Sequence, residues 1–102
     1  MKPKWSVRAA QRYERVYRYV RSTFGMKAAS DFRKRVKETE RLLQSNPQLG
    51  ALEPLLIDSS NSYRSVTIYG LSKLVYVVED NTILVADFWD CRWEPASNTE
   101  NL

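Results

Sequence analysis

The hydrophobic pattern changes its period near the middle of the chain, and this change constrains the fold more than any other feature. In residues 6–46 apolar side chains recur at three- and four-residue steps, which is typical of amphipathic helices. From Tyr63 onward they alternate with polar side chains, which is typical of strands with one buried face. A chain of 102 residues can bury one hydrophobic core but not two. The sequence therefore predicts a single α+β domain.

The first half of the chain predicts two helices that form an antiparallel hairpin. Ser6 can cap the first helix, and Gly25 can end it because glycine accepts the left-handed conformation of a helix C-terminus without strain. Asn46-Pro47 ends the second helix, since proline cannot continue the hydrogen-bond ladder. The predicted apolar stripes comprise Ala10, Tyr13, Val16, Tyr17, Val20 and Phe24, then Ala29, Phe32, Val36, Leu42 and Leu43.

The second half predicts an antiparallel meander of three strands. These strands are Tyr63–Tyr69, Lys73–Glu79 and Thr82–Trp89, which are rich in β-branched and aromatic residues. Gly70 and Asp80-Asn81 supply the turns between them. The segment from Gln48 to Asn61 is expected to be irregular.

The predicted sheet has one face toward the helices and one face outward. In the first strand Val66 and Ile68 point one way, whereas Ser65, Thr67 and Tyr69 point the other way. Lys2–Trp5 can add a fourth, short edge strand, in which Pro3 is tolerated because it cannot donate to a ladder. The expected fold is thus a two-helix hairpin on one face of a three- to four-stranded, mainly antiparallel sheet, in the order β-α-α-β-β-β. We expect one domain over residues 1–95 and a flexible tail over residues 96–102.

Charge is divided unevenly along the chain. Residues 1–41 contain thirteen Lys or Arg against four Asp or Glu, a balance of +9, whereas residues 42–102 have a balance of −5. The helical half is therefore suited to an acidic partner, either a nucleic acid or an acidic peptide, although a solvated face that binds nothing would have the same composition. Arg8, Arg12 and Arg15 lie on one side of the first helix, where they could follow phosphates or form an ordinary polar face.

Several classes of protein are excluded by composition. No stretch approaches the roughly 20 consecutive apolar residues that a membrane span needs, and no signal peptide follows the charged start, so we expect a cytoplasmic protein. Cys91 is the only cysteine and there is no histidine, which rules out an internal disulfide and the usual zinc sites. A glycine-rich phosphate loop is also missing, so we expect no cofactor and no metal.

The end of the last predicted strand holds acidic and aromatic residues that need an interpretation. Asp87 and Asp90 are three apart, which places them on opposite faces of a strand, so we expect solvated charges and no catalytic carboxylate pair. Trp89 and Trp93 lie where a core residue is less expected, so each is either an exposed anchor for a partner or packed over the sheet edge. Cys91 is expected to be a buried, unreactive thiol.

Local motifs make the chain resemble the RelE/ParE superfamily of bacterial toxins. The matching segments follow the same order as in that family and together cover residues 2–95. They are Trp5-Ser6-Val7-Arg8-Ala9, Phe24-Gly25 with Ala28, Ala29 and Phe32, Asn46-Pro47 with Gly50, Tyr63-Arg64-Ser65-Val66, the segment from Leu74 to Asn81, and the segment from Phe88 to Pro95. The resemblance implies the toxin of a type II toxin-antitoxin (plasmid stabilisation) system, held inactive by an antitoxin protein.

The superfamily contains two mechanisms: RelE-like members cleave messenger RNA on the ribosome, and ParE-like members poison DNA gyrase. The cleaving members carry basic side chains on the outward face of the strand that matches Tyr63–Tyr69, where this chain has Ser65 and Thr67. Their next arginine corresponds to Lys73, and their last catalytic groups fall on Cys91 and Arg92. These departures favour a ParE-like inhibitor that acts by binding, with the ribonuclease and a non-toxic basic nucleic-acid-binding module as alternatives.

The resemblance also implies roles for individual residues. If the chain is a ribonuclease, Lys73 and Arg92 are the groups left to stabilise a phosphate, and no general acid or base is evident. In the binding alternative, we expect Arg8, Arg12 and Arg15 to bind the antitoxin. The residues expected to contact the gyrase or ribosomal target are Arg64, Lys73, Trp89, Arg92 and Trp93.

Overall fold

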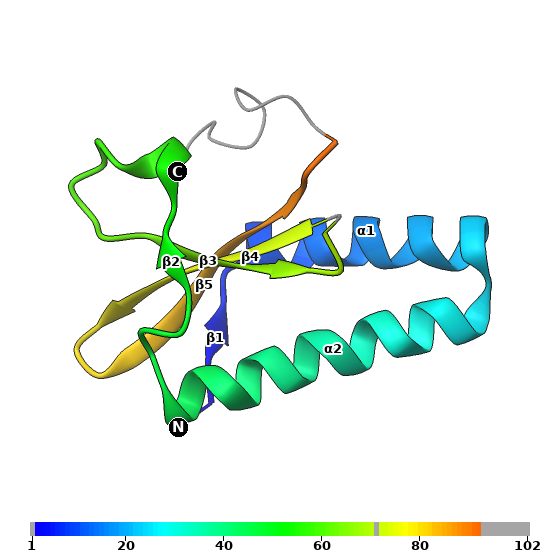
Figure 1. The fold of residues 1–102 in the computed structure, drawn as a ribbon, viewed down its shortest axis with the longest axis horizontal. Coiled ribbons are helices and arrows are strands. Elements are labelled where there is room, and N and C mark those ends of the chain that lie inside the picture. The colour runs from blue at the N-terminus through cyan, green and yellow to red at the C-terminus, as the bar shows by residue number, and fades with distance from the viewer. Residues whose placement is uncertain (1, 71, 93–102) are drawn as a thin grey trace.

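The computed structural model describes residues 2–70 and 72–92 (Figure 1). Two long helices follow a short first strand, and the remaining strands come from the second half of the chain. The elements are β1 (Lys4–Trp5), α1 (Val7–Phe24), α2 (Met26–Ser45), β2 (Ala51–Leu52), the 3₁₀ turn η1 (Pro54–Leu56), β3 (Arg64–Ile68), β4 (Ser72–Glu79) and β5 (Thr82–Asp90).

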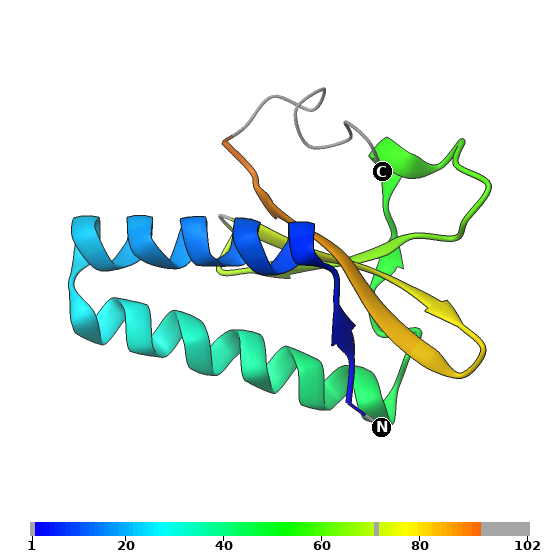
Figure 2. The same cartoon turned by 180° about the vertical axis from the view of Figure 1, so that it is seen from behind.

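The two helices form an antiparallel hairpin that packs on one face of a five-stranded sheet (Figures 1 and 2). The strand order is β1-β5-β4-β3-β2, in which β1 pairs parallel with β5 and every other pair is antiparallel. The predicted α+β class and element order are confirmed. The prediction of three or four strands was short by one, because the segment expected to be irregular contains β2.

Tyr76 holds β2 in place from the middle of the sheet. Its hydroxyl group donates to the backbone oxygen of Pro47 at 2.7 Å and accepts from the amide of Gly50 at 2.9 Å. A Cβ atom on Gly50 would lie 2.7 Å from the backbone oxygen of Ser65, so only glycine allows this approach without a shift. β2 therefore depends on a contact from β4, which no local pattern in its own sequence indicates.

The predicted helix boundaries are confirmed. The Ser6 hydroxyl accepts from the amide of Ala9 at 3.0 Å and donates to the backbone oxygen of Ala86, which ties the start of α1 to β5. Gly25 has a φ of 95° and joins the two helices, and α2 ends at Asn46. Asp80 and Asn81 both have positive φ, as the tight turn between β4 and β5 requires.

The main core lies between the hairpin and the sheet. Trp5, Tyr13, Phe32 and Phe88 contact one another through stacked and edge-on rings whose centroids lie 5.4–6.1 Å apart. Phe24 was expected in this core, but its exposed fraction is 58%, so that prediction was wrong. Phe24 is the last residue of α1, at the end of the hairpin that extends past the sheet (Figure 1).

A second, smaller core lies on the outward face of the sheet. Trp89 packs there with Val75 and Leu56, and the half-buried Tyr63 lies against them. Only 1% of Trp89 is exposed, so the hypothesis of an exposed anchor at this position was wrong. Leu56 of η1 packs over the ring of Trp89. The position of Trp89 at the end of a strand does not by itself predict this contact. Within the described residues, no helix is long and apolar enough to cross a membrane.

Candidate binding surfaces

Glu53 forms a buried polar centre on the outward face of the sheet. Its carboxylate accepts from Lys73 Nζ at 2.8 Å, from the Ser65 hydroxyl at 2.9 Å and from the amide of Leu55 at 2.8 Å, and only 1% of the residue is exposed. Burial by itself raises the pKa of Glu53, but these hydrogen bonds lower the pKa more, so it lies below its ordinary value. The carboxylate is therefore ionised at neutral pH and neutralises Lys73.

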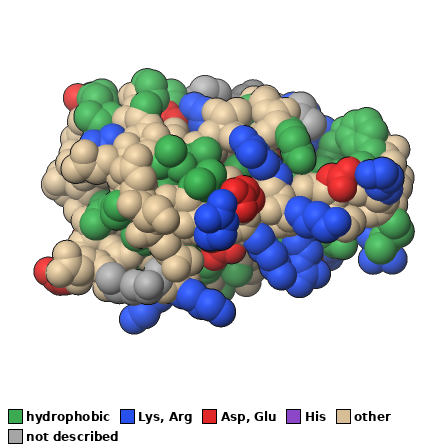
Figure 3. Space-filling model, turned by 60° about the horizontal axis from the view of Figure 1, so that its bottom comes forward, with side chains coloured by type: hydrophobic (Ala, Val, Ile, Leu, Met, Phe, Trp, Pro, Cys, Tyr) green, Lys and Arg blue, Asp and Glu red, His purple; other side chains and the backbone are tan. Residues whose placement is uncertain are grey.

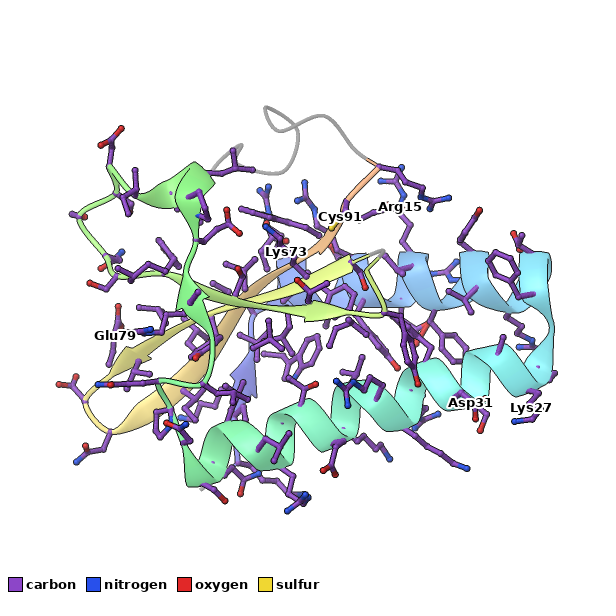
Figure 4. All side chains as sticks on the ribbon, in the orientation of Figure 1. Arg15, Lys27, Asp31, Lys73, Glu79 and Cys91 are labelled. Carbon is purple, nitrogen blue, oxygen red and sulfur yellow. The ribbon has the colours of Figure 1, made fainter. Side chains whose placement is uncertain are left out.

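Cys91 follows β5 on the same outward side, close to Lys73 (Figure 4). The thiol is exposed, so the expectation of a buried cysteine was wrong. Partial burial of the sulfur raises its pKa, Lys73 lowers it, and the carboxylates of Asp90 and Glu53 raise it again. The net pKa is raised, so the thiol stays protonated at neutral pH and is a poor nucleophile.

Asp87 is the second buried carboxylate of the outward face. Arg8 Nε donates to it at 3.0 Å, Arg12 Nη1 at 3.1 Å and Trp89 Nε1 at 2.9 Å. The two arginines come from the first turns of α1, which begins beside Val85 where β1 ends. The buried carboxylate of Asp87 therefore holds the start of α1 against the end of β5.

The expectation that Asp87 and Asp90 are solvated was wrong. Asp87 is 0% exposed because it is covered by arginines that are distant in sequence, such as Arg8. Asp90 is 3% exposed because Arg92, in the adjoining turn, covers it. Their predicted placement on opposite faces is confirmed, since Asp87 contacts Trp89 on the outward face and Asp90 lines a cleft on the helix side. The i, i+4 spacing of Arg8 and Arg12 was the sequence signal that could have indicated a shared carboxylate.

An apolar cleft of about 390 Å³ lies between the hairpin and the β3–β4 end of the sheet. Asp90 and Arg92 form an ion pair at its rim, and the guanidinium of Arg92 lies 3.8 Å from the centre of the Tyr19 ring. Burial raises the pKa of Asp90, but hydrogen bonds from Arg92 lower it more, so its net pKa is lowered. The apolar lining consists of Val16, Tyr19, Val20, Phe24, Ala28, Phe32, Ile68 and Tyr69.

The residues expected to contact a target are not brought together in one place. Lys73 lies on the outward face with Glu53, whereas Arg92 lines the cleft on the other face. Arg64 donates to the backbone oxygen of Gly50 at 2.7 Å, and Trp89 is buried. Trp93 lies outside the described residues.

The three arginines expected to bind an antitoxin do share one side of α1. Arg8 and Arg12 hold Asp87, with side chains 26% and 20% exposed. Arg15 is exposed and near enough to Asp90 to lower the pKa of that carboxyl. Figure 4 shows Arg15 on the same side of the molecule as Lys73 and Cys91. Among the described residues, no cluster of three or more Cys, Asp or Glu side chains could hold a metal ion.

Comparison with known proteins supports the fold first and then the family. No protein of curated function is similar to the chain at a significant level. The structure is similar to a chain of the chromosomal ParDE TA system from P. aeruginosa, with a TM-score of 0.69 and 20% identity over 88% of this chain and 95% of that chain. Residues 4–93 match the family described as the ParE toxin of the type II toxin-antitoxin system, parDE. This chain therefore belongs to the ParE toxin family of type II toxin-antitoxin systems.

Proposed function

We propose that this toxin arrests growth by binding a macromolecular target such as DNA gyrase, and not by cleaving messenger RNA. The observation that carries the proposal is the 2.8 Å ion pair between Lys73 and the buried Glu53. A phosphate-stabilising group must present its positive charge to the substrate, but the charge of Lys73 is already neutralised by a carboxylate of its own chain.

The surroundings of Lys73 support the same conclusion. RNA cleavage needs a group that takes a proton from the 2′-hydroxyl and another that protonates the leaving oxygen. The chain has no histidine, the Ser65 hydroxyl donates a hydrogen bond to Glu53, and the raised pKa of Cys91 keeps its thiol protonated. Glu53 is ionised, but its oxygens are occupied by three donors and it is buried beneath η1.

The first test follows three processes in one bacterial culture after the toxin is induced: DNA replication, protein synthesis and the integrity of messenger RNA. We expect replication to stop while messages remain intact. Purified toxin should then inhibit supercoiling by DNA gyrase. Early loss of translation with cut messages would contradict the proposal and support a ribonuclease.

Single substitutions can show which face contacts the target. Lys73 and Arg92 lie on opposite faces, so Lys73→Ala and Arg92→Ala should not reduce growth arrest equally. Each side chain is paired with a buried carboxylate, Arg92 with Asp90 and Lys73 with Glu53. We expect the larger loss for Arg92→Ala, because the Arg92 side chain is 45% exposed whereas that of Lys73 is 29% exposed. Lys4→Ala, an exposed charge on β1, is the control, and thermal unfolding checks that each variant folds.

We also propose that the cognate antitoxin places apolar side chains in the cleft and carboxylates near Arg15 and Arg92. The cleft is lined almost wholly by apolar side chains, and a helix or strand with acidic and apolar faces would match both features. Arg8 and Arg12 then act mainly by keeping α1 against β5 through Asp87. Such a segment would cover the Arg92 side of the toxin.

A further inference from the structure

The outward surface of α2 is strongly basic and takes no part in the core. Six of its lysines and arginines are exposed. The sixth, Arg35, lies near Glu38 and lowers the pKa of that carboxyl. We call the other five the α2 basic face: Lys27, Arg33, Lys34, Lys37 and Arg41. The buried residues of the helix, such as Phe32 and Val36, lie on the opposite side. Figure 3, which brings α2 toward the viewer, shows Lys and Arg side chains gathered across this surface.

Only part of this charge is balanced within the chain. Lys27 pairs with Asp31, and Arg41 pairs with Glu38. Among the described residues, no carboxylate lies within ion-pair distance of Arg33, Lys34 or Lys37. Lys37 lies i+4 from Arg33 and i+3 from Lys34 on one helix, and like charges at these spacings repel one another. A polyanion laid along the helix would remove that repulsion.

We infer that the α2 basic face binds the phosphate backbone of double-stranded DNA without reading its sequence. Residues 33–41 extend over about 12 Å of helix axis at 1.5 Å per residue. Each strand of DNA carries one phosphate per about 3.4 Å of its axis, so a groove edge offers three or four phosphates over that length. The length and spacing of the α2 basic face therefore match the regular spacing of phosphates along a DNA duplex.

Features of the same surface favour duplex DNA over other acidic partners. Peptides that dock on helices use apolar anchors, but the only exposed apolar side chain described on α2 is Met26 at its first position. Single-stranded nucleic acids are held by aromatic side chains that stack on bases. The α2 basic face contains no aromatic residue, and Tyr13 and Tyr17, in the groove beside Arg33 and Lys37, are half-buried and pack on the core. A face that offers charge alone is suited to the backbone of a duplex.

Apart from Lys27, whose partner Asp31 lines the cleft, the α2 basic face is separate from the surfaces in the proposed function. The cleft is lined from α2 by Ala28, Asp31 and Phe32 only, and Glu53 and Lys73 lie beyond the sheet. DNA could therefore contact α2 while a protein occupies the cleft or the outward face. The inference does not depend on whether gyrase is the target.

Fluorescence anisotropy of a labelled 20-base-pair DNA duplex with the full chain tests this inference. The variant Arg33→Gln/Lys34→Gln/Lys37→Gln removes the three unbalanced charges and keeps good helix formers. The control Ser60→Glu/Ser62→Glu/Thr67→Glu changes the net charge by the same amount at exposed positions of the sheet half. Circular dichroism verifies that both variants keep their helices.

We expect the α2 variant to bind DNA about 10- to 100-fold more weakly near 0.1 M salt. The slope of log K against log salt is negative, and each lost phosphate contact reduces its magnitude by about 0.9. The slope should therefore become shallower by about 2 to 3. The control should keep the wild-type slope. Equal weakening by the control would show that net charge alone attracts DNA and would overturn the inference. It would equally be overturned by tighter binding of a duplex RNA of the same length, or by a wild-type chain that does not bind DNA.

Discussion

The Nζ atom of Lys73 lies 2.8 Å from Oε1 of Glu53, so a cation on the sheet surface is neutralised by a carboxylate of the same chain. These residues come from β4 and from the start of η1, which pack together on the outward face. This pairing is the observation on which the proposed non-cleaving mechanism rests. It also makes the stability of this face dependent on pH.

Glu53→Gln should destabilise the protein by about 1 to 3 kcal/mol at pH 7, because Lys73 then loses its partner. The pKa of Glu53 is lowered in the folded state. Its contribution to stability is therefore present above the unfolded pKa, about 4.3, and is lost as the pH falls through the folded pKa. Urea unfolding from pH 7 down to pH 3 should show the difference between variant and wild type shrinking below about pH 4.

The exposed Glu79 provides the matched control for this measurement, since it lies at the end of β4 that is remote from Lys73 (Figure 4). Glu79→Gln should change stability by less than about 0.5 kcal/mol at every pH. A loss of stability in Glu53→Gln that stays constant down to pH 3 would mean that its charge is not the cause.

Asp87→Asn should cost about 3 to 5 kcal/mol, because it removes the buried carboxylate charge that Arg8 and Arg12 both contact. Arg8→Gln and Arg12→Gln should each cost less, since the other arginine still holds the carboxylate. In the double variant of the two arginines the loss should exceed the sum of the single losses. Equilibrium unfolding in urea measures all four variants, and strict additivity of the two arginine substitutions would mean that the two ion pairs are independent.

Cys91 should react slowly with iodoacetamide at pH 7.5 although it is exposed, because its raised pKa leaves little thiolate. The rate should rise with pH and reach half its maximum above about 8.5, the pKa of an unperturbed thiol. Lys73→Met should raise that midpoint further, since Lys73 lowers the pKa of this thiol. The chain unfolded in urea is the control, and an equal rate in the folded protein would contradict the prediction.

Phe24→Glu should weaken binding of the cognate antitoxin at least about tenfold, because it would place a carboxylate in the apolar part of the cleft, which the antitoxin fills in the proposed complex. Stability should change little, since 58% of Phe24 is exposed. Met26→Glu is the control, because Met26 is also 58% exposed but does not line the cleft. Co-purification and calorimetry with the cognate antitoxin measure the effect, and equal losses in both variants would exclude the cleft as the contact.

Local features of the sequence were enough to predict both helices and four of the five strands, with their order, but not β2 or η1. Ser6 and Gly25 act on backbone groups a few residues away, and the Asp80-Asn81 turn closes within two residues. Such signals depend on neighbours along the chain, so they can be interpreted without tertiary structure. The alternation of apolar side chains likewise indicated which face of β3 meets the helices, because strand geometry fixes that alternation.

Whether the charged and aromatic side chains are paired, buried or exposed depends on contacts between segments that are distant in sequence. Glu53 meets Lys73 across 20 positions, and Asp87 meets Arg8 across 79, so neither pair is visible as a local pattern. Trp89 is buried because η1 lies over it, and Phe24 is exposed because the hairpin extends past the sheet. The sequence by itself determined the fold and its division of charge. Whether a given charge is solvated, paired or available to a partner depends on what packs around it, and the tertiary structure alone supplies that environment.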